Sequence, residues 1–200
     1  MIKNVIFDLG NVLLGFRPSE YLEKNKYPDN LKKTILADIF NSREWLMLDN
    51  GDINIDDAIE AISLRSSLKK LEIVRIFNLR REILVPVDSN LKMLPELKEH
   101  GFRLYFLSNF PADLWYEVKN KYSFFKEFDG GLISAEVKVS KPDIRIFRIL
   151  LEKYSLNPEE CFFIDDIEAN VRSAETIGIK GLFTNGSEVI SGEMRKALGI

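Results

Sequence analysis

Short runs of apolar residues, many of them β-branched or aromatic, recur at the start of the chain and through its second half. Their length and their lack of polar positions are typical of strands buried on both faces, and the sequence predicts five such strands, at 4–7, 103–107, 131–134, 161–164 and 181–184. Between them, apolar residues recur at helical spacing over 91–100, 144–154 and 170–177. This alternation predicts an α/β fold, a Rossmann-like parallel sheet with right-handed crossovers and helices on both faces.

One interval breaks the alternation. Between Gly15 and Val87 the chain shows no convincing strand and carries amphipathic stretches at 31–40, 55–64 and 71–84. We therefore expect a helical insert at 16–87, within a core formed by 1–15 and 88–200. Inside the insert, the segment Asp49-Asn50-Gly51-Asp52 is predicted to be a turn between two helices.

Composition excludes several classes of function. The chain has 200 residues, 46% hydrophobic, with a formal net charge of −3 and no cluster of Lys and Arg, so no nucleic-acid or membrane partner is expected. The first strand follows the start directly and no apolar run is long enough to span a membrane, so we expect a cytoplasmic protein. The lone Cys161 and lone His100 leave no disulfide and no histidine metal site. No coiled-coil pattern or exposed apolar stripe is evident, which favours a monomer or a weak homodimer.

Polar side chains follow four of the predicted strands where each strand ends. Because the carboxyl ends of parallel strands share one edge, these residues should converge on one crevice: Asp8, Ser108, Asn109, Lys141, Asp165 and Asp166. Three carboxylates could hold a hard divalent cation such as Mg²⁺, and a lysine with a hydroxyl and an amide could hold the oxygens of a phosphate. Taken singly, each residue also fits a helix cap, a turn or an exposed surface position.

The same residues carry a resemblance to a known family. Four segments resemble the four motifs of the haloacid dehalogenase-like hydrolase superfamily: Asp8-Leu9-Gly10-Asn11-Val12, Leu107-Ser108-Asn109, Lys141-Pro142 and Phe163-Ile164-Asp165-Asp166. The opening motif is similar to that of sugar-phosphate phosphatases, and the helical insert resembles the small helical cap of the superfamily.

The resemblance implies a role for each residue. Asp8 would be the catalytic nucleophile, and Ser108, Asn109 and Lys141 would bind the phosphoryl group, whose charge Lys141 also stabilises. The metal set would hold Mg²⁺ through Asp8, the backbone carbonyl of Gly10, Asp165 and Asp166. The implied activity is a Mg²⁺-dependent phosphatase that acts on small phosphorylated metabolites, with sugar phosphates as candidates, through an aspartyl-phosphate.

Gly10 is the departure from this pattern. Most phosphatases of the superfamily carry a second aspartate at this position, which protonates the leaving alkoxide and later activates water. General acid-base help is worth about 10²–10⁴-fold, so substrate, water or a cap residue would have to replace it. Two other functions stay open: a metal-independent 2-haloacid dehalogenase, whose family members also lack this aspartate, and a catalytically weakened phosphate-binding or regulatory protein.

Overall fold

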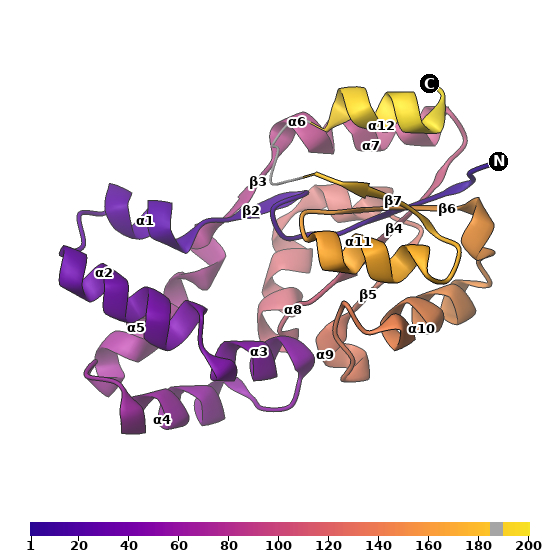
Figure 1. The fold of residues 1–200 in the computed structure, drawn as a ribbon. Coiled ribbons are helices and arrows are strands. Elements are labelled where there is room, and N and C mark those ends of the chain that lie inside the picture. The colour runs from indigo at the N-terminus through magenta and orange to yellow at the C-terminus, as the bar shows by residue number, and fades with distance from the viewer. Residues whose placement is uncertain (185–189) are drawn as a thin grey trace.

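The computed structural model describes residues 1–184 and 190–200. Its centre is a five-stranded parallel sheet in the order β5-β4-β1-β6-β7, which confirms the predicted α/β class (Figure 1). The strands are β1 (Asn4–Phe7), β4 (Arg103–Ser108), β5 (Gly130–Ile133), β6 (Cys161–Asp165) and β7 (Lys180–Phe183). β1 lies in the middle, paired with β4 and β6, so the residue that follows it emerges at the centre of the edge.

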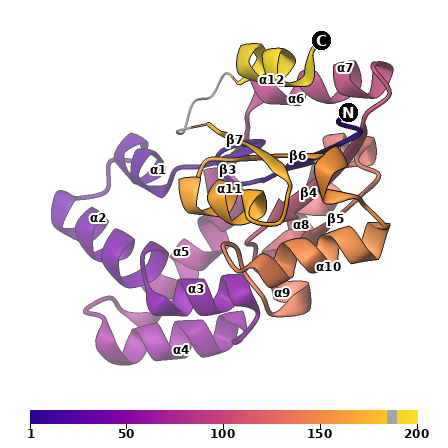
Figure 2. The same cartoon turned by 45° about the vertical axis from the view of Figure 1, so that its right-hand side comes forward.

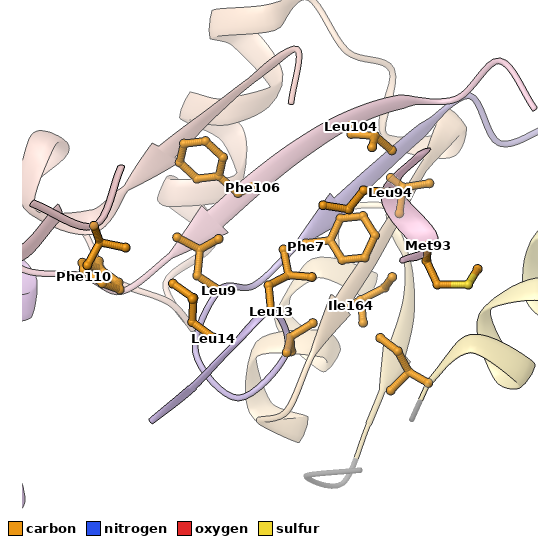
Figure 3. Packing of buried hydrophobic residues seen from close by; sticks show 14 of the residues in the cluster. Phe7, Leu9, Leu13, Leu14, Met93, Leu94, Leu104, Phe106, Phe110 and Ile164 are labelled. Carbon is orange, nitrogen blue, oxygen red and sulfur yellow. The ribbon is translucent and has the colours of Figure 1, made fainter. Parts of the chain in front are cut away.

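Helices cover both faces of this sheet, because successive strand residues point to opposite sides. Val5 and Phe7 of β1 pack with one group of helices and Ile6 with the other. The first group is α7 (Met93–Glu99), α8 (Ala112–Lys121) and α12 (Ser191–Leu198), and the second is α10 (Ile144–Tyr154) and α11 (Glu168–Glu175). Figure 2 shows α7 and α12 together on one side of the sheet, and Figure 3 shows Phe7 beside Leu94 and Met93.

Short helical turns complete this part of the molecule. They are α6 (Asp88–Leu91), η2 (Ser123–Glu127), α9 (Ser134–Val137) and η3 (Pro158–Glu160). The helix predicted at 91–100 corresponds to α7, and Lys92 alone separates it from α6, which ends at Leu91.

The remaining helices run from Pro18 to Ile83, within the predicted helical insert at 16–87, and form a separate layer (Figure 1). It consists of α1 (Pro18–Lys24), α2 (Asp29–Ile35), a π-helical turn η1 (Leu36–Phe40), α3 (Arg43–Asn50), α4 (Ile55–Arg65) and α5 (Lys70–Ile83). It has its own apolar cluster, in which Trp45 stacks on Phe77 with ring centroids 6.1 Å apart. Helices α1 and α3 lie outside the ranges predicted from the sequence.

Two strands join the helical insert to the sheet. β2 (Leu14–Phe16) and β3 (Leu84–Pro86) pair antiparallel, so the expectation of no strand between Gly15 and Val87 is wrong. Each has only three residues, too few to display an alternating pattern, and the pairing brings together segments far apart in the chain. Among the described residues, no helix is long and apolar enough to cross a membrane.

Candidate active site

The carboxyl edge of the sheet opens into a cavity of about 250 Å³ beneath the helical insert. All the residues predicted from the sequence line it except Asp165, which lies directly behind it. The tertiary structure thus brings Asp8, Gly10, Ser108, Asn109, Lys141 and Asp166 to one place. This convergence follows from the parallel strands, whose ends meet at a common edge.

Lys141 sits between two carboxylates in the interior. Its Nζ lies 2.8 Å from Asp8 Oδ1 and 2.6 Å from Asp165 Oδ2, and all three side chains are buried. Burial acts against the charged ammonium, but the two carboxylates outweigh it and raise the pKa of Lys141. The lysine is therefore a fixed positive charge beside Asp8.

Asn109 holds the loop that carries this lysine. Its Oδ1 accepts a hydrogen bond from the Lys141 backbone N–H at 2.8 Å, and its Nδ2 donates to the Lys141 carbonyl at 2.9 Å. The amide is thus engaged with backbone on both sides, while Ser108 is buried at the end of β4 and lines the cavity. Sequence reasoning anticipated phosphate contact for Asn109 but not this support of the lysine loop.

Asp8 carries more negative charge around it than Lys141 neutralises. Burial raises the pKa of the Asp8 carboxyl to about 7, with Asp165 and Asp166 adding to the rise and Lys141 opposing it. Its backbone is fixed by a hydrogen bond of 2.8 Å from the Asp8 N–H to the Ile164 carbonyl. A cation placed here would favour the ionised carboxylate, which is the form that a nucleophile needs.

Three carboxylates are close enough to share such a cation. Asp8, Asp165 and Asp166 each offer an oxygen, and these oxygens lie within 4.8 Å of one another. Burial also raises the pKa of Asp166, and the charge of Asp165 adds to this rise. Oxygen donors with uncompensated charge fit a hard ion such as Mg²⁺.

The two neighbouring aspartates differ in what their oxygens are free to do. Asp165 accepts from Lys141 Nζ, from the Ile167 N–H at 2.8 Å and from Asn170 Nδ2 at 3.0 Å to each oxygen, which uses its four lone-pair sites. Asp166 has a lighter set of contacts in the described part of the chain, where its Oδ2 accepts from Asn11 Nδ2 at 3.0 Å. Asn170, in the first turn of α11, thus supports Asp165 from behind the loop.

Asn11 is a functional residue that sequence reasoning missed. Its backbone has φ 54°, a left-handed conformation that Asn tolerates better than most residues. In this conformation its Oδ1 accepts from the Phe16 N–H at 3.0 Å while its Nδ2 orients Asp166. The Gly-Asn pair after Asp8 was a signal for such a turn, but its contact with Asp166 is purely tertiary.

The cavity has a second wall, which is mostly apolar and combines residues of the helical insert, of the connecting strands β2 and β3, and of the loops and helices around the sheet edge. It consists of Phe16, Trp45, Leu46, Leu84, Phe110, Pro111, Leu114 and Ile167. One acid, Asp49, is part of this wall. Predicted as a turn residue, Asp49 lies in the last turn of α3, and the turn itself begins at Gly51.

Comparisons with known proteins agree with this geometry. A family model described as haloacid dehalogenase-like hydrolase matches residues 2–178. The chain is 29% identical over 197 residues to a sesquiterpene phosphatase of Aspergillus oryzae, covering 98% of this chain and 97% of that one. It is 24% identical over 188 residues to a phosphorylated carbohydrates phosphatase of Thermotoga maritima, covering 91% and 84%. An HAD family enzyme of Bacteroides thetaiotaomicron, solved with magnesium and inorganic phosphate, superposes with a TM-score of 0.75 at 26% identity, covering 98% and 100%.

Proposed function

The chain belongs to the haloacid dehalogenase-like hydrolase family, and from this premise we propose that it is a Mg²⁺-dependent phosphatase of small phosphate monoesters. The observation that carries the proposal is the pairing of Asp8 with a buried lysine 2.8 Å away and with a cluster of carboxylate oxygens. Phosphate esters resist attack because their oxygens are anionic, so a site for them needs positive charge and in-line positioning. Lys141 supplies positive charge directly, and the carboxylate cluster would supply more through the Mg²⁺ that it is proposed to hold.

In this mechanism a carboxylate oxygen of Asp8 attacks phosphorus and the ester oxygen leaves, which forms an aspartyl-phosphate. Lys141 stabilises the charge on the phosphoryl oxygens, and Ser108 holds them at the end of β4. Asn109 stays a predicted phosphate ligand through its second Nδ2–H, because its Oδ1 and its other Nδ2–H bond the Lys141 backbone. Water then attacks phosphorus and the bond to Asp8 breaks, which releases inorganic phosphate. Mg²⁺, when bound, supplies further positive charge beside the phosphoryl oxygens.

We assign the metal contacts to Asp8, the backbone carbonyl of Gly10 and Asp166. Asp165 stays a predicted member of this set because it lies within the cluster, but its lone pairs are occupied by four hydrogen bonds. Its main contribution in this proposal is to fix Lys141. The magnesium and phosphate in the related B. thetaiotaomicron structure support a cation at this place.

We further propose that residues 16–87 act as a cap over a core of 1–15 and 88–200, and that the cap selects the leaving group. The apolar wall of the cavity favours an ester with an apolar leaving group, as does the similarity to a sesquiterpene phosphatase, and the cavity volume of about 250 Å³ favours a compact one. A sugar phosphate is the second candidate, supported by the opening motif and by the T. maritima relative.

Two rival functions have less support. A metal-independent dehalogenase has no use for a cluster of carboxylates whose charge is uncompensated, and this chain keeps that cluster. A protein that only binds phosphate, with catalysis weakened, would not need the nucleophile Asp8 beside Lys141. Both residues are present here and are in contact.

A phosphate-release screen tests the proposal. The panel pairs isopentenyl phosphate with glyceraldehyde 3-phosphate and glucose phosphates, and adds chloride release from 2-chloropropionate, each with Mg²⁺ or with EDTA. We expect Mg²⁺-dependent phosphate release that is fastest with isopentenyl phosphate and lost in Asp8→Asn. Chloride release that survives EDTA, or phosphate release that is unchanged in Asp8→Asn, would overturn the proposed phosphatase mechanism. Faster phosphate release from the sugar phosphates than from isopentenyl phosphate would overturn only the proposed preference for an apolar leaving group.

A further inference from the structure

We propose that Asp49, on the helical insert, is the general acid and base of the reaction, in place of the side chain that Gly10 lacks. This inference rests on the proposed phosphatase function. Asp49 and Asp8 line the same cavity, Asp49 from the last turn of α3 and Asp8 from the position directly after β1. In this role the Asp49 carboxyl group protonates the ester oxygen that leaves from a phosphate bound at Asp8.

The core itself leaves this position open. A Cβ built on Gly10 would meet a single atom within 4 Å, Asp8 Oδ2 at 3.6 Å, which is ordinary contact. The backbone of Gly10 is not in the left-handed region either, so neither space nor conformation requires glycine. The acid-base group is therefore free to come from the other wall of the cavity.

The end of α3 is fixed to the core, which places Asp49 accurately. The Asp49 carbonyl accepts a hydrogen bond from Ser134 Oγ, and the same Oγ accepts from the Phe110 N–H at 2.9 Å. One residue further, Asn50 Oδ1 accepts from Ser140 Oγ at 2.9 Å. Asp49 is thus tied to the loop after β4 and to the loop that carries Lys141.

Close packing reinforces this attachment. At Gly51, where φ is +73°, a Cβ would come within 2.7 Å of the Ala135 carbonyl, so the chain passes directly against α9. Only glycine fits both the left-handed turn and this approach. The contact holds the last turn of α3 down on the sheet edge.

The surroundings of Asp49 suit an acid that carries a proton. Within the part of the chain that the structure describes, no hydrogen bond or ion pair holds its carboxyl group. Burial raises its pKa well above the usual range, Asp8 adds to the rise, and the Arg80 guanidinium of α5 opposes it. A carboxylate in the last turn of a helix also faces the negative end of the helix dipole, so local helix stability does not explain its presence.

The protons balance over the two steps. As an oxygen of Asp8 bonds to phosphorus, the ester P–O bond breaks and its electron pair stays on the leaving oxygen, which takes the proton of the Asp49 carboxyl group. Asp49, now ionised, accepts a proton from the water whose oxygen attacks the phosphoryl group. The bond from phosphorus to Asp8 breaks, and Asp8 and Asp49 return to their starting states.

Leaving-group dependence tests this role. A general acid matters most for a poor leaving group, so kcat is compared for isopentenyl phosphate, an alkyl ester, and p-nitrophenyl phosphate, whose leaving oxygen needs little protonation. For Asp49→Asn we expect a loss of about 10²–10⁴-fold on the alkyl ester and less than about 10-fold on the aryl ester. Asp52→Asn, an exposed acid in the turn after α3, is the matched control and should retain both activities.

Rescue provides the second arm. Adding Gly10→Asp to Asp49→Asn should restore at least about 10-fold of the alkyl activity, since the side chain has room beside Asp8. An equal loss on both esters, or no loss on either, would refute the role of Asp49. If the wild-type protein releases phosphate from no ester with Mg²⁺, the proposed function fails first and this inference falls with it.

Discussion

Replacement of Asp165 by asparagine tests how buried charge holds the site together. Asp165 is fully buried and accepts hydrogen bonds from Lys141, Ile167 and Asn170, all of which are donors. An asparagine NH₂ must therefore point at a donor whichever way the amide turns. Breaking a buried ion pair costs about 3–5 kcal/mol, and because Lys141 keeps its contact with Asp8, we expect a loss of about 3 kcal/mol in the free energy of unfolding.

For a chain of this length each kcal/mol shifts Tm by about 2–4 °C, so Asp165→Asn should melt about 6–12 °C below the wild type. The matched control is Asp166→Asn, since Asp166 is partly exposed and its side-chain partner among the described residues is the uncharged Asn11. We expect it to lose about 1 kcal/mol or less. Thermal and urea denaturation should be measured with EDTA present, because bound metal would add its own stabilisation. Stabilities of the two variants within about 1 kcal/mol of each other would refute the reasoning.

Three further changes probe the attachment of the helical insert and the metal site. Gly51→Ala should lower both Tm and phosphatase activity, because the added Cβ would collide with the Ala135 backbone. Gly101→Ala is the control: it is also at positive φ but has nothing within 4 Å, so it should cost only about 1 kcal/mol in stability and leave activity intact. Equal effects of the two substitutions would contradict the packing argument. Asp113→Ala removes the carboxylate 2.5 Å from the buried Arg80 and should cost about 1.5–3 kcal/mol in urea denaturation, and an unchanged midpoint would exclude this link between α8 and α5. Asn11→Ala should weaken the apparent Mg²⁺ affinity about 10–100-fold in an activation curve, and an unshifted curve would count against its orienting role.

Much of the core could be predicted because its signals are local. The strand at Asn4–Phe7 is wholly apolar apart from its first residue, and such a run with a polar residue at its end indicates both a buried strand and a residue at the sheet edge. Helix α10 occupies the predicted range, since its apolar residues lie on one face and Asp143 caps its start. Parallel strand order then implies that Asp8, Lys141 and Asp166 meet, and the structure brings them together.

What the sequence could not provide was the set of contacts made across the two layers. β2 and β3 stabilise each other only when paired, and no local pattern marks a strand of three residues. The sequence predicts Asn109 as a phosphate ligand but not the two hydrogen bonds that its amide makes with the N–H and the carbonyl of Lys141. Both the strand pairing and the contacts of Asn109 depend on segments that are distant in the chain and adjacent in space.

By itself the sequence determined the class of fold and the charged residues at the sheet edge, because hydrophobic periodicity and strand ends are properties of neighbouring residues. Only the tertiary structure decided which carboxylate is held by hydrogen bonds, as Asp165 is, and which acid of the helical insert lines the cavity together with Asp8 and Gly10. Asp49 lies in a different layer from Asp8, and its position is set by the docking of α3 on α9. The physical reason is that the burial and the electrostatic environment of a side chain depend on residues that are close in space, whereas hydrophobic periodicity depends only on residues that are close in the sequence.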